Sequence, residues 1–185
     1  NTPNWDGRLE FFIRLRSGPF STFLAEVAKP GMKLTVHGPL GAFGVAEGSL
    51  RPRWFVTGGT GLAPMLSMLR RMAEFQEMQE VRLFFGVNQE CELFALDELR
   101  RLCSELPQLH VVFCVWQPEG DLSMGTEPNW LYVKGTPIDA VKHAFASSTV
   151  QPDLYVCGPT PLVDATFKMA NEAGLPPDQI FSERF

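Results

Sequence analysis

The chain has 185 residues, of which 45% are hydrophobic and 20% are charged, and its formal net charge is −5. This composition supports a hydrophobic core, and the length fits one ordinary domain or a small domain joined to part of another. The acidic balance, without any block of Lys or Arg, argues against nucleic acid and anionic membranes as partners. No apolar run approaches the roughly 18 residues that a membrane-spanning helix needs.

The first fifty residues predict part of a β-rich unit. Residues 8–15 are typical of a strand, residues 20–31 of a short helix, and residues 32–45 of a strand that runs into glycine turns. This order is typical of an antiparallel barrel but is too short to close one. We therefore predict a partial antiparallel β-barrel over residues 1–50, with the domain boundary at residues 46–52.

Residues 51–185 predict an alternation of strands and helices. Near-continuous apolar strands with amphipathic segments between them indicate a parallel sheet covered by helices on both faces. We predict an α/β domain with an open, five-stranded parallel sheet. The expected strands are 53–59, 81–87, 109–115, 153–159 and 179–185, and the expected helices begin near residues 62, 96, 138 and 162. Residues 117–136, rich in Gly, Pro and Trp, are expected to form the longest loop.

The four cysteines, Cys91, Cys103, Cys114 and Cys157, form no C-x-x-C pair and have no His at a zinc-like spacing. Their mostly apolar neighbours favour reduced thiols in a cytoplasmic protein. They match no familiar iron–sulfur pattern. Because the chain begins at Asn1 rather than at Met, we expect it to be a piece of a longer chain.

The glycine-rich turn after the first parallel strand, from Gly58 to Gly61, is the first candidate site. Glycines allow backbone N–H groups to approach an anion, and the start of the next helix favours negative charge. The turn is not the Rossmann fingerprint, because Pro64 stands where the third glycine belongs. It is also not a P-loop, because no G-K-[ST] follows. A purely structural turn is the alternative interpretation.

A second turn, Cys157–Pro159, also places glycine between a strand and a helix. Ligands of open parallel sheets bind outside the carboxyl ends of the strands, so we expect the two turns to line one crevice. For Cys157 the alternative is a small buried thiol without a role at the site.

The end of the second parallel strand bears on the choice of dinucleotide. A 2′-phosphate would require Arg or Lys there, whereas residues 86–99 contain no basic residue and include Glu90 and Glu92. NADH is therefore favoured over NADPH. A solvated acidic helix start is the alternative.

Taken in order, several segments resemble the ferredoxin–NADP reductase superfamily, and within it the oxygenase-reductase branch. These segments are HGPLGAFGV, GGTGLAPMLSMLRRM, FFGVNQECELFALDEL, DLYVCGPTPLVDA and the terminal SERF. The likeness is greatest to reductases of the methane monooxygenase type, and reductases of the phenol hydroxylase type are similar. The resemblance implies an FAD-binding barrel domain that ends within residues 1–50 and an NADH-binding domain over residues 51–185.

The resemblance also implies a reaction. Hydride would pass from NADH to FAD, and single electrons would then reach a [2Fe–2S] ferredoxin domain and an oxygenase or hydroxylase component. The flavin motif R-x-Y-S and the ferredoxin domain would both precede Asn1. Two alternatives are a non-catalytic nucleotide-sensing or docking module on the same fold, and a flavohaemoglobin-like or ferric-reductase-like enzyme.

The family pattern implies roles for individual residues. Thr60 and Cys157 would place the nicotinamide ring, with Glu183 nearby, and the terminal Phe185 would stack on the flavin unless it is only a core aromatic. The implied cofactor-binding residues are Phe20, Ser21 and Thr22 for the flavin pyrophosphate, Gly58, Gly59 and Gly61 for the dinucleotide pyrophosphate, Gly158 and Pro159 beside the nicotinamide, and Asn88, Phe94 and Trp116 around the adenosine.

Overall fold

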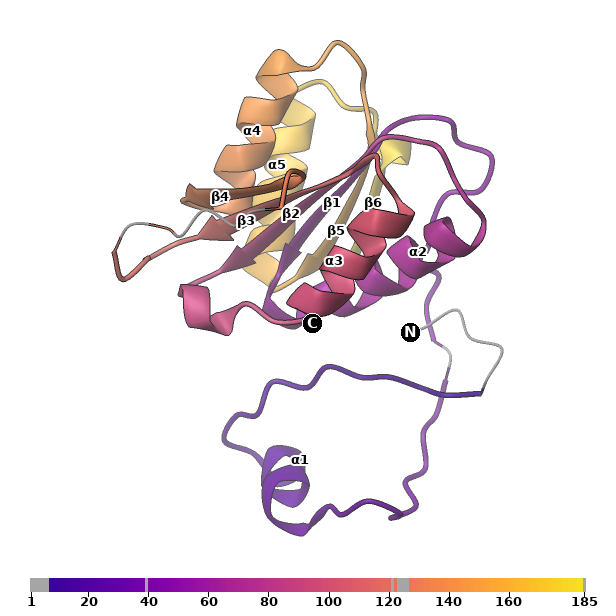
Figure 1. Ribbon diagram of the computed structural model, residues 1–185, viewed down its shortest axis with the longest axis vertical. Coiled ribbons are helices and arrows are strands. Elements are labelled where there is room, and N and C mark those ends of the chain that lie inside the picture. Colours follow the sequence, from indigo (N-terminus) through magenta and orange to yellow (C-terminus); the bar gives the residue numbers. More distant parts are fainter. Residues whose placement is uncertain (1–6, 39, 121, 123–126, 185) are drawn as a thin grey trace.

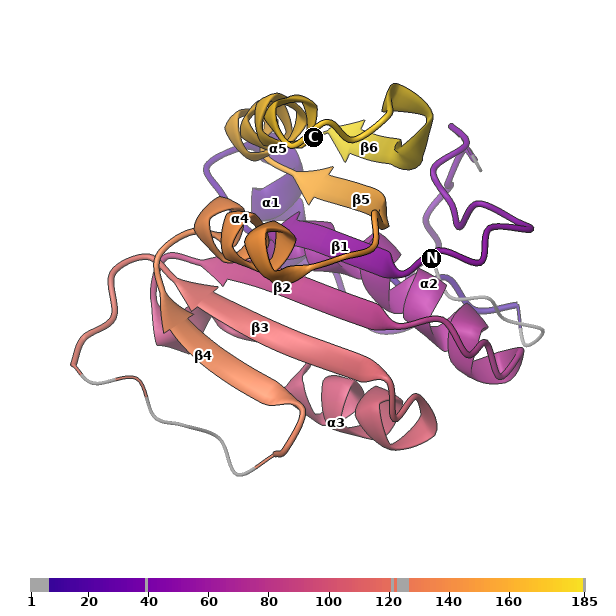
Figure 2. The same ribbon diagram turned by 90° about the horizontal axis from the view of Figure 1, so that it is seen from above.

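The computed structural model describes residues 7–38, 40–120, 122 and 127–184. Its centre is a six-stranded, fully parallel sheet with the strand order β4-β3-β2-β1-β5-β6 (Figures 1 and 2). The strands are β1 (Arg53–Gly58), β2 (Val81–Val87), β3 (Leu109–Val115), β4 (Trp130–Lys134), β5 (Asp153–Gly158) and β6 (Ile180–Arg184).

Helices follow the strands and cover both faces of this sheet. Figure 2 shows α2 and α3 on one face and α4 and α5 on the other. The helices are α1 (Pro19–Thr22), α2 (Leu62–Glu74), α3 (Leu96–Glu105), α4 (Pro137–Ser147) and α5 (Thr160–Glu172), and a π-helical turn, Phe23–Val27, extends α1.

Each central strand is buried on both of its faces. In β1, Phe55 belongs to the core under α2 and α3, whereas Trp54 and Val56 belong to the core under α4 and α5. Because successive side chains point to opposite faces, most positions of such a strand are apolar, and Arg53 and Thr57 are the buried polar residues of β1. This explains why the strands appear in the sequence as continuous apolar runs.

The sheet has six strands rather than the predicted five. The additional strand, β4, forms within residues 117–136, which were predicted to be a loop. Trp130 is buried and packs edge-on against Phe113, with 4.9 Å between ring centroids, whereas Leu131 is half exposed. An edge strand that is covered on one face gives a weaker apolar pattern than a central strand, and neighbouring Gly and Pro obscure it further.

The strands predicted at 8–15 and 32–45 are wrong, and the described residues among the first fifty form no barrel. A strand requires a neighbour that accepts and donates backbone hydrogen bonds. The described residues of these two segments, 8–15, 32–38 and 40–45, pair with no strand in the described part of the chain. Their apolar side chains remain largely exposed, as at Leu9 (55%) and Leu34 (57%).

The described residues show neither a membrane-spanning helix nor a metal cluster. The two longest helices, α2 and α5, have 13 residues each, and no described helix combines the length and apolar character needed to cross a bilayer. Within the same ranges, no three His, Cys, Asp or Glu side chains gather where they could hold a metal ion. The four cysteines are free thiols, of which Cys91 is exposed and Cys157 is buried.

Gly61 generates a prediction about stability. A Cβ at this position would clash with the backbone carbonyl of Cys157 and lie 2.8 Å from Oγ1 of Thr57. We expect Gly61→Val to lower the free energy of unfolding by roughly 3 kcal/mol, because the added side chain forces β1 and β5 apart. Thermal unfolding followed by circular dichroism measures this loss.

Gly44→Ala is the matched control, because a Cβ at Gly44 meets no atom within 4 Å. Its melting temperature should stay close to that of the unsubstituted chain. An equally stable Gly61→Val variant would contradict the close approach of the two strands.

Candidate functional site

The strand order creates a crevice at the carboxyl ends of β1 and β5. The two strands are neighbours, but α2 follows β1 onto one face of the sheet and α5 follows β5 onto the other (Figure 2). Chains that leave neighbouring strands in opposite directions open a binding crevice between them. A cavity of about 1240 Å³ lies at this edge of the sheet.

The cavity brings together most of the residues that the sequence singled out. Those that line it are Gly58, Gly59, Thr60, Asn88, Phe94, Trp116, Cys157, Pro159 and Glu183. Gly61 and Gly158 shape its two turns but do not line it. Phe20, Ser21 and Thr22 lie on α1, apart from the cavity lining. The predicted role of Phe185 lies outside the described residues.

The turn after β1 is open towards the cavity at Gly59. Its backbone has φ +55°, and a Cβ built there would meet no atom within 4 Å. The helix α2 follows without a side-chain hydrogen bond to its first turn. Uncapped N–H groups and the helix dipole together favour an anion at such a position. The turn therefore has the geometry of a phosphate cradle.

The turn after β5 lies directly against the turn after β1. A Cβ at Gly158, where φ is +151°, would lie 3.2 Å from the backbone nitrogen of Gly58 and 3.1 Å from Cδ2 of Leu162. Neither turn tolerates a bulky side chain at this contact, because it would separate the strands. The contact also fixes Cys157 next to the β1 turn.

Cys157 contributes a neutral thiol to the wall of the cavity. Only 1% of its surface is exposed, and this burial raises the pKa of the thiol to about 12, with a further contribution from the nearby carboxylate of Glu183. A thiolate is strongly disfavoured in such surroundings. The group is therefore suited to packing against an uncharged ring rather than to nucleophilic attack.

Glu92 is held firmly at the end of β2. One carboxylate oxygen accepts a hydrogen bond from the N–H of Asn88 at 2.8 Å, and the other pairs with the guanidinium of Arg14 at 2.9 Å. Gln89 completes a capping box with Glu92. Of the two acidic residues considered for dinucleotide selection, Glu92 lines the cavity and Glu90 does not.

The two aromatic residues predicted near the adenosine have different surroundings. The Phe94 ring packs against Phe12 at 5.2 Å and edge-on against Phe85 at 5.5 Å. Trp116 is 52% exposed, and its backbone N–H donates to the carbonyl oxygen of Val87 at 3.0 Å. Trp116 thus offers an accessible ring on a fixed backbone, whereas Phe94 joins the N-terminal segment to the core.

Two arginines line the cavity that sequence reasoning missed. Arg14 and Arg16 come from the N-terminal segment, together with Phe12 and Ile13. Phe12, Arg14 and Arg16 alternate along the chain, which is the period of one face of an extended segment. This alternation was the available signal, but nothing in the sequence indicated that this face would meet the crevice.

The residues of α1 bond to their own neighbourhood. Oγ of Ser21 accepts a hydrogen bond from the N–H of Arg16 at 3.1 Å, and the N–H of Thr22 donates to Gly18 at 3.0 Å. Phe20 is 57% exposed and stacks on Phe23. These hydrogen bonds of α1 therefore join residues within the stretch 16–22.

Comparisons with known proteins identify the family of the α/β part of the chain. The sequence model described as the oxidoreductase NAD-binding domain matches residues 55–168, which run from β1 into α5. The reductase component of propane 2-monooxygenase from Rhodococcus jostii (strain RHA1) is 30% identical over 185 residues, covering 100% of this chain and 49% of that protein. Methane monooxygenase component C from Methylosinus trichosporium is 41% identical over 138 residues, covering 74% of this chain and 38% of that protein.

A solved structure supports the same assignment. The ferredoxin reductase in carbazole 1,9a-dioxygenase superposes with a TM-score of 0.74 at 26% identity, covering 94% of this chain and 50% of that chain. The chain spans about half the length, or less, of these relatives. Because the sequence model matches more than half of this chain, the chain belongs to the ferredoxin reductase family of FAD- and NAD-binding oxidoreductases.

Proposed function

We propose that the chain is the FAD/NADH part of a flavoprotein reductase that supplies electrons to an oxygenase. The observation that carries this proposal is the crevice between the β1 and β5 turns, which combines an open phosphate cradle with a neutral, buried thiol. Two relatives are reductase components of a propane and a methane monooxygenase system. The chain spans half of them or less, so the activity of the whole protein is part of the proposal.

The crevice fits a dinucleotide. Its volume of about 1240 Å³ exceeds the roughly 300–1,000 Å³ of common small-molecule sites. The backbone at Gly58 and Gly59, with the first turn of α2, would hold the pyrophosphate. Asn88 and Trp116 lie at the ends of β2 and β3, where the adenosine would bind. Gly61 would contribute to the site indirectly, because its lack of a side chain lets the β1 and β5 turns approach each other.

The nicotinamide would lie between Thr60 and the β5 turn. When bound, NADH and FAD supply the redox chemistry, in which hydride passes from the nicotinamide to the flavin. The chain's own residues orient the ring and exclude water from one side of it. Cys157 and Pro159 provide an uncharged wall for this purpose, and Glu183 places a carboxylate at its edge.

On the flavin side, we assign Phe20, Ser21 and Thr22 to the flavin pyrophosphate, with Phe185 at the flavin ring. Support comes from the glycine at position 18, which precedes α1, and from the exposed Phe20 side chain. The electron route would continue to a [2Fe–2S] ferredoxin domain and an oxygenase component in the cytoplasm. Methane monooxygenase is the proposed system, because its component C is the more similar of the two relatives in percentage identity.

Gly59→Val tests the phosphate cradle. We expect NADH binding to weaken by at least about tenfold, because a β-branched residue is strained at φ +55° and would project into the open side of the turn. Isothermal titration calorimetry measures the affinity, and circular dichroism checks that the sheet persists. A folded variant with the original affinity would remove the β1 turn from the proposed site.

The choice between NADH and NADPH is a second test. We expect NADH to bind at least roughly tenfold more tightly, because residues 86–99 supply no basic side chain for a 2′-phosphate, and Arg14, which also lines the cavity, is already paired with the carboxylate of Glu92. Glu92→Gln should narrow this ratio, whereas Glu90→Gln should leave it unchanged because residue 90 does not line the cavity. Equal affinities for the two dinucleotides would overturn the assignment.

Thiol labelling tests the environment of Cys157. With N-ethylmaleimide at neutral pH, we expect the exposed Cys91 to react first and Cys157 to remain unmodified, because its pKa of about 12 keeps the buried thiol protonated. Peptide mass spectrometry identifies the modified residues. Since the pKa is raised, the thiol loses its proton only well above neutral pH, so NADH affinity should not change through this group between about pH 6 and pH 9.

A further inference from the structure

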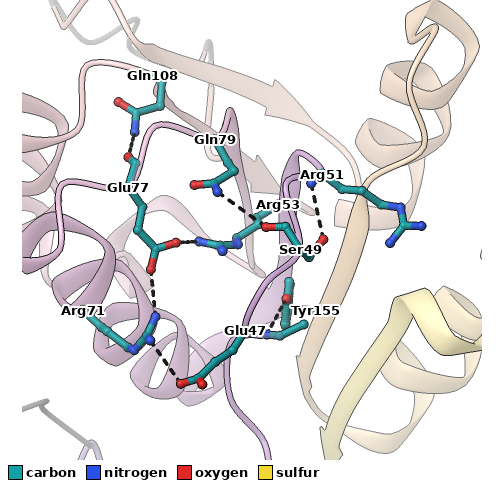
Figure 3. A network of polar contacts seen from close by, with 10 residues as sticks. Glu47, Ser49, Arg51, Arg53, Arg71, Glu77, Gln79, Gln108 and Tyr155 are labelled. Carbon is teal, nitrogen blue, oxygen red and sulfur yellow. Dashed lines mark hydrogen bonds and ion pairs between the residues drawn. The ribbon is translucent and has the colours of Figure 1, made fainter.

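The linker that leads into β1, defined here as residues 46–52, is bound to the α/β domain at three successive points (Figure 3). The N–H of Ala46 donates to the hydroxyl of Tyr155 at 3.1 Å. Arg71 pairs with Glu47 at 3.3 Å, and Nε2 of Gln79 donates to the carbonyl oxygen of Ser49 at 3.5 Å. The linker is therefore anchored to β5, to α2 and to the loop after α2, rather than free as a flexible hinge.

The Tyr155 anchor is the most firmly placed of the three. Tyr155 is fully buried, and its ring stacks on Phe181 at 4.8 Å with an interplanar angle of 14° and lies 5.1 Å from Phe55. The packed ring fixes its hydroxyl in space, and the hydrogen bond from Ala46 is partly buried, which strengthens it relative to a bond in water. Glu47, in contrast, is 84% exposed, and such surface pairs contribute little.

A buried ion pair supports the same edge of the domain. The guanidinium of Arg53, only 3% exposed, pairs with Glu77, and the second carboxylate oxygen of Glu77 pairs with Arg71 at 2.8 Å. Arg71 then reaches Glu47, so a continuous line of charges connects the start of β1 with the linker (Figure 3). This network fixes the side chain of Arg71, but its last contact to the linker is exposed to solvent.

Tyr155 connects this anchor to the crevice through a single strand. Tyr155 and Cys157 are two residues apart on β5, so both side chains point to the same face and both belong to the core under α2 and α3. Much earlier in the chain than the linker, Phe12, Arg14 and Arg16 line the same cavity. Strand β5 therefore carries both Cys157, at the proposed nicotinamide site, and Tyr155, which holds the start of the linker, and it fixes the distance between them.

We propose that Tyr155 is a positioning residue for hydride transfer: by holding Ala46, it fixes how the described residues that precede it, 7–38 and 40–45, lie over the nicotinamide side of the crevice. The inference rests on the proposed function, since it assigns the flavin to the side of these residues. Tyr155 touches neither reactant in this account. It acts through the linker, and donor–acceptor placement within about 1 Å decides transfer rates.

Tyr155→Phe removes the hydroxyl and keeps the ring. Hydrogen exchange in the chain should show the Ala46 amide about five- to tenfold less protected, which is the equilibrium effect of one ordinary hydrogen bond. The amides of β1 and β5 should keep their protection, and the NADH dissociation constant should stay within about twofold, because the crevice itself is unchanged. In the flavin-loaded protein, kcat should fall by roughly three- to tenfold while KM for NADH stays constant.

Tyr132→Phe is the matched control. Tyr132 is the other tyrosine of the chain; it lies on β4, at the far edge of the sheet, and stacks on Phe113 at 4.7 Å. It should change neither Ala46 exchange nor kcat. Unchanged exchange at Ala46 in Tyr155→Phe, or lost protection with an unchanged kcat, would overturn the inference. An unsubstituted chain that fails to bind NADH would instead contradict the proposed function.

Discussion

The close contact between the turns after β1 and β5 is the constraint on which the site depends. Gly58 and Gly158 lie against each other, and Gly61 lies against the backbone of Cys157. Only residues without a Cβ allow two neighbouring parallel strands to end so near each other while their helices leave to opposite faces. The proposed phosphate cradle and Cys157 share one cavity because of this contact. The packing of the strands and the proposed binding site therefore both require glycine at these positions.

The α/β part of the fold could be predicted from sequence because its signals are local. Strands such as β2 and β3 are buried on both faces and give uninterrupted apolar runs, and α2 and α3 repeat apolar residues at helical spacing. The edge strand β4 could not be predicted in the same way, since only Trp130 of its five residues is buried. The crevice was expected from the general behaviour of parallel sheets, whereas no order of the strands was predicted from the sequence.

The site residues that directly follow strands could be predicted from the sequence. Those that come from the N-terminal segment, far away in the sequence, could not. Thr60, Asn88, Trp116 and Cys157 come from the carboxyl ends of strands, and the structure gathers them in one cavity. Arg14 reaches the same cavity through contacts between residues about eighty positions apart, as in its pair with Glu92. No local pattern encodes such a contact, because it depends on how the N-terminal segment packs against the α/β domain.

The exposed apolar residues of the N-terminal segment have a consequence for how the chain behaves in solution. Residues 8–15, 32–38 and 40–45 form no strand and carry backbone donors and acceptors without ladder partners among the described residues, beside side chains such as Phe11 and Val36 that are more than half exposed. Extended, apolar segments with unpaired edges readily add strands from other molecules. Self-association of this chain should therefore begin at its N-terminal segment, where an added strand would satisfy the backbone and cover the apolar surface at the same time.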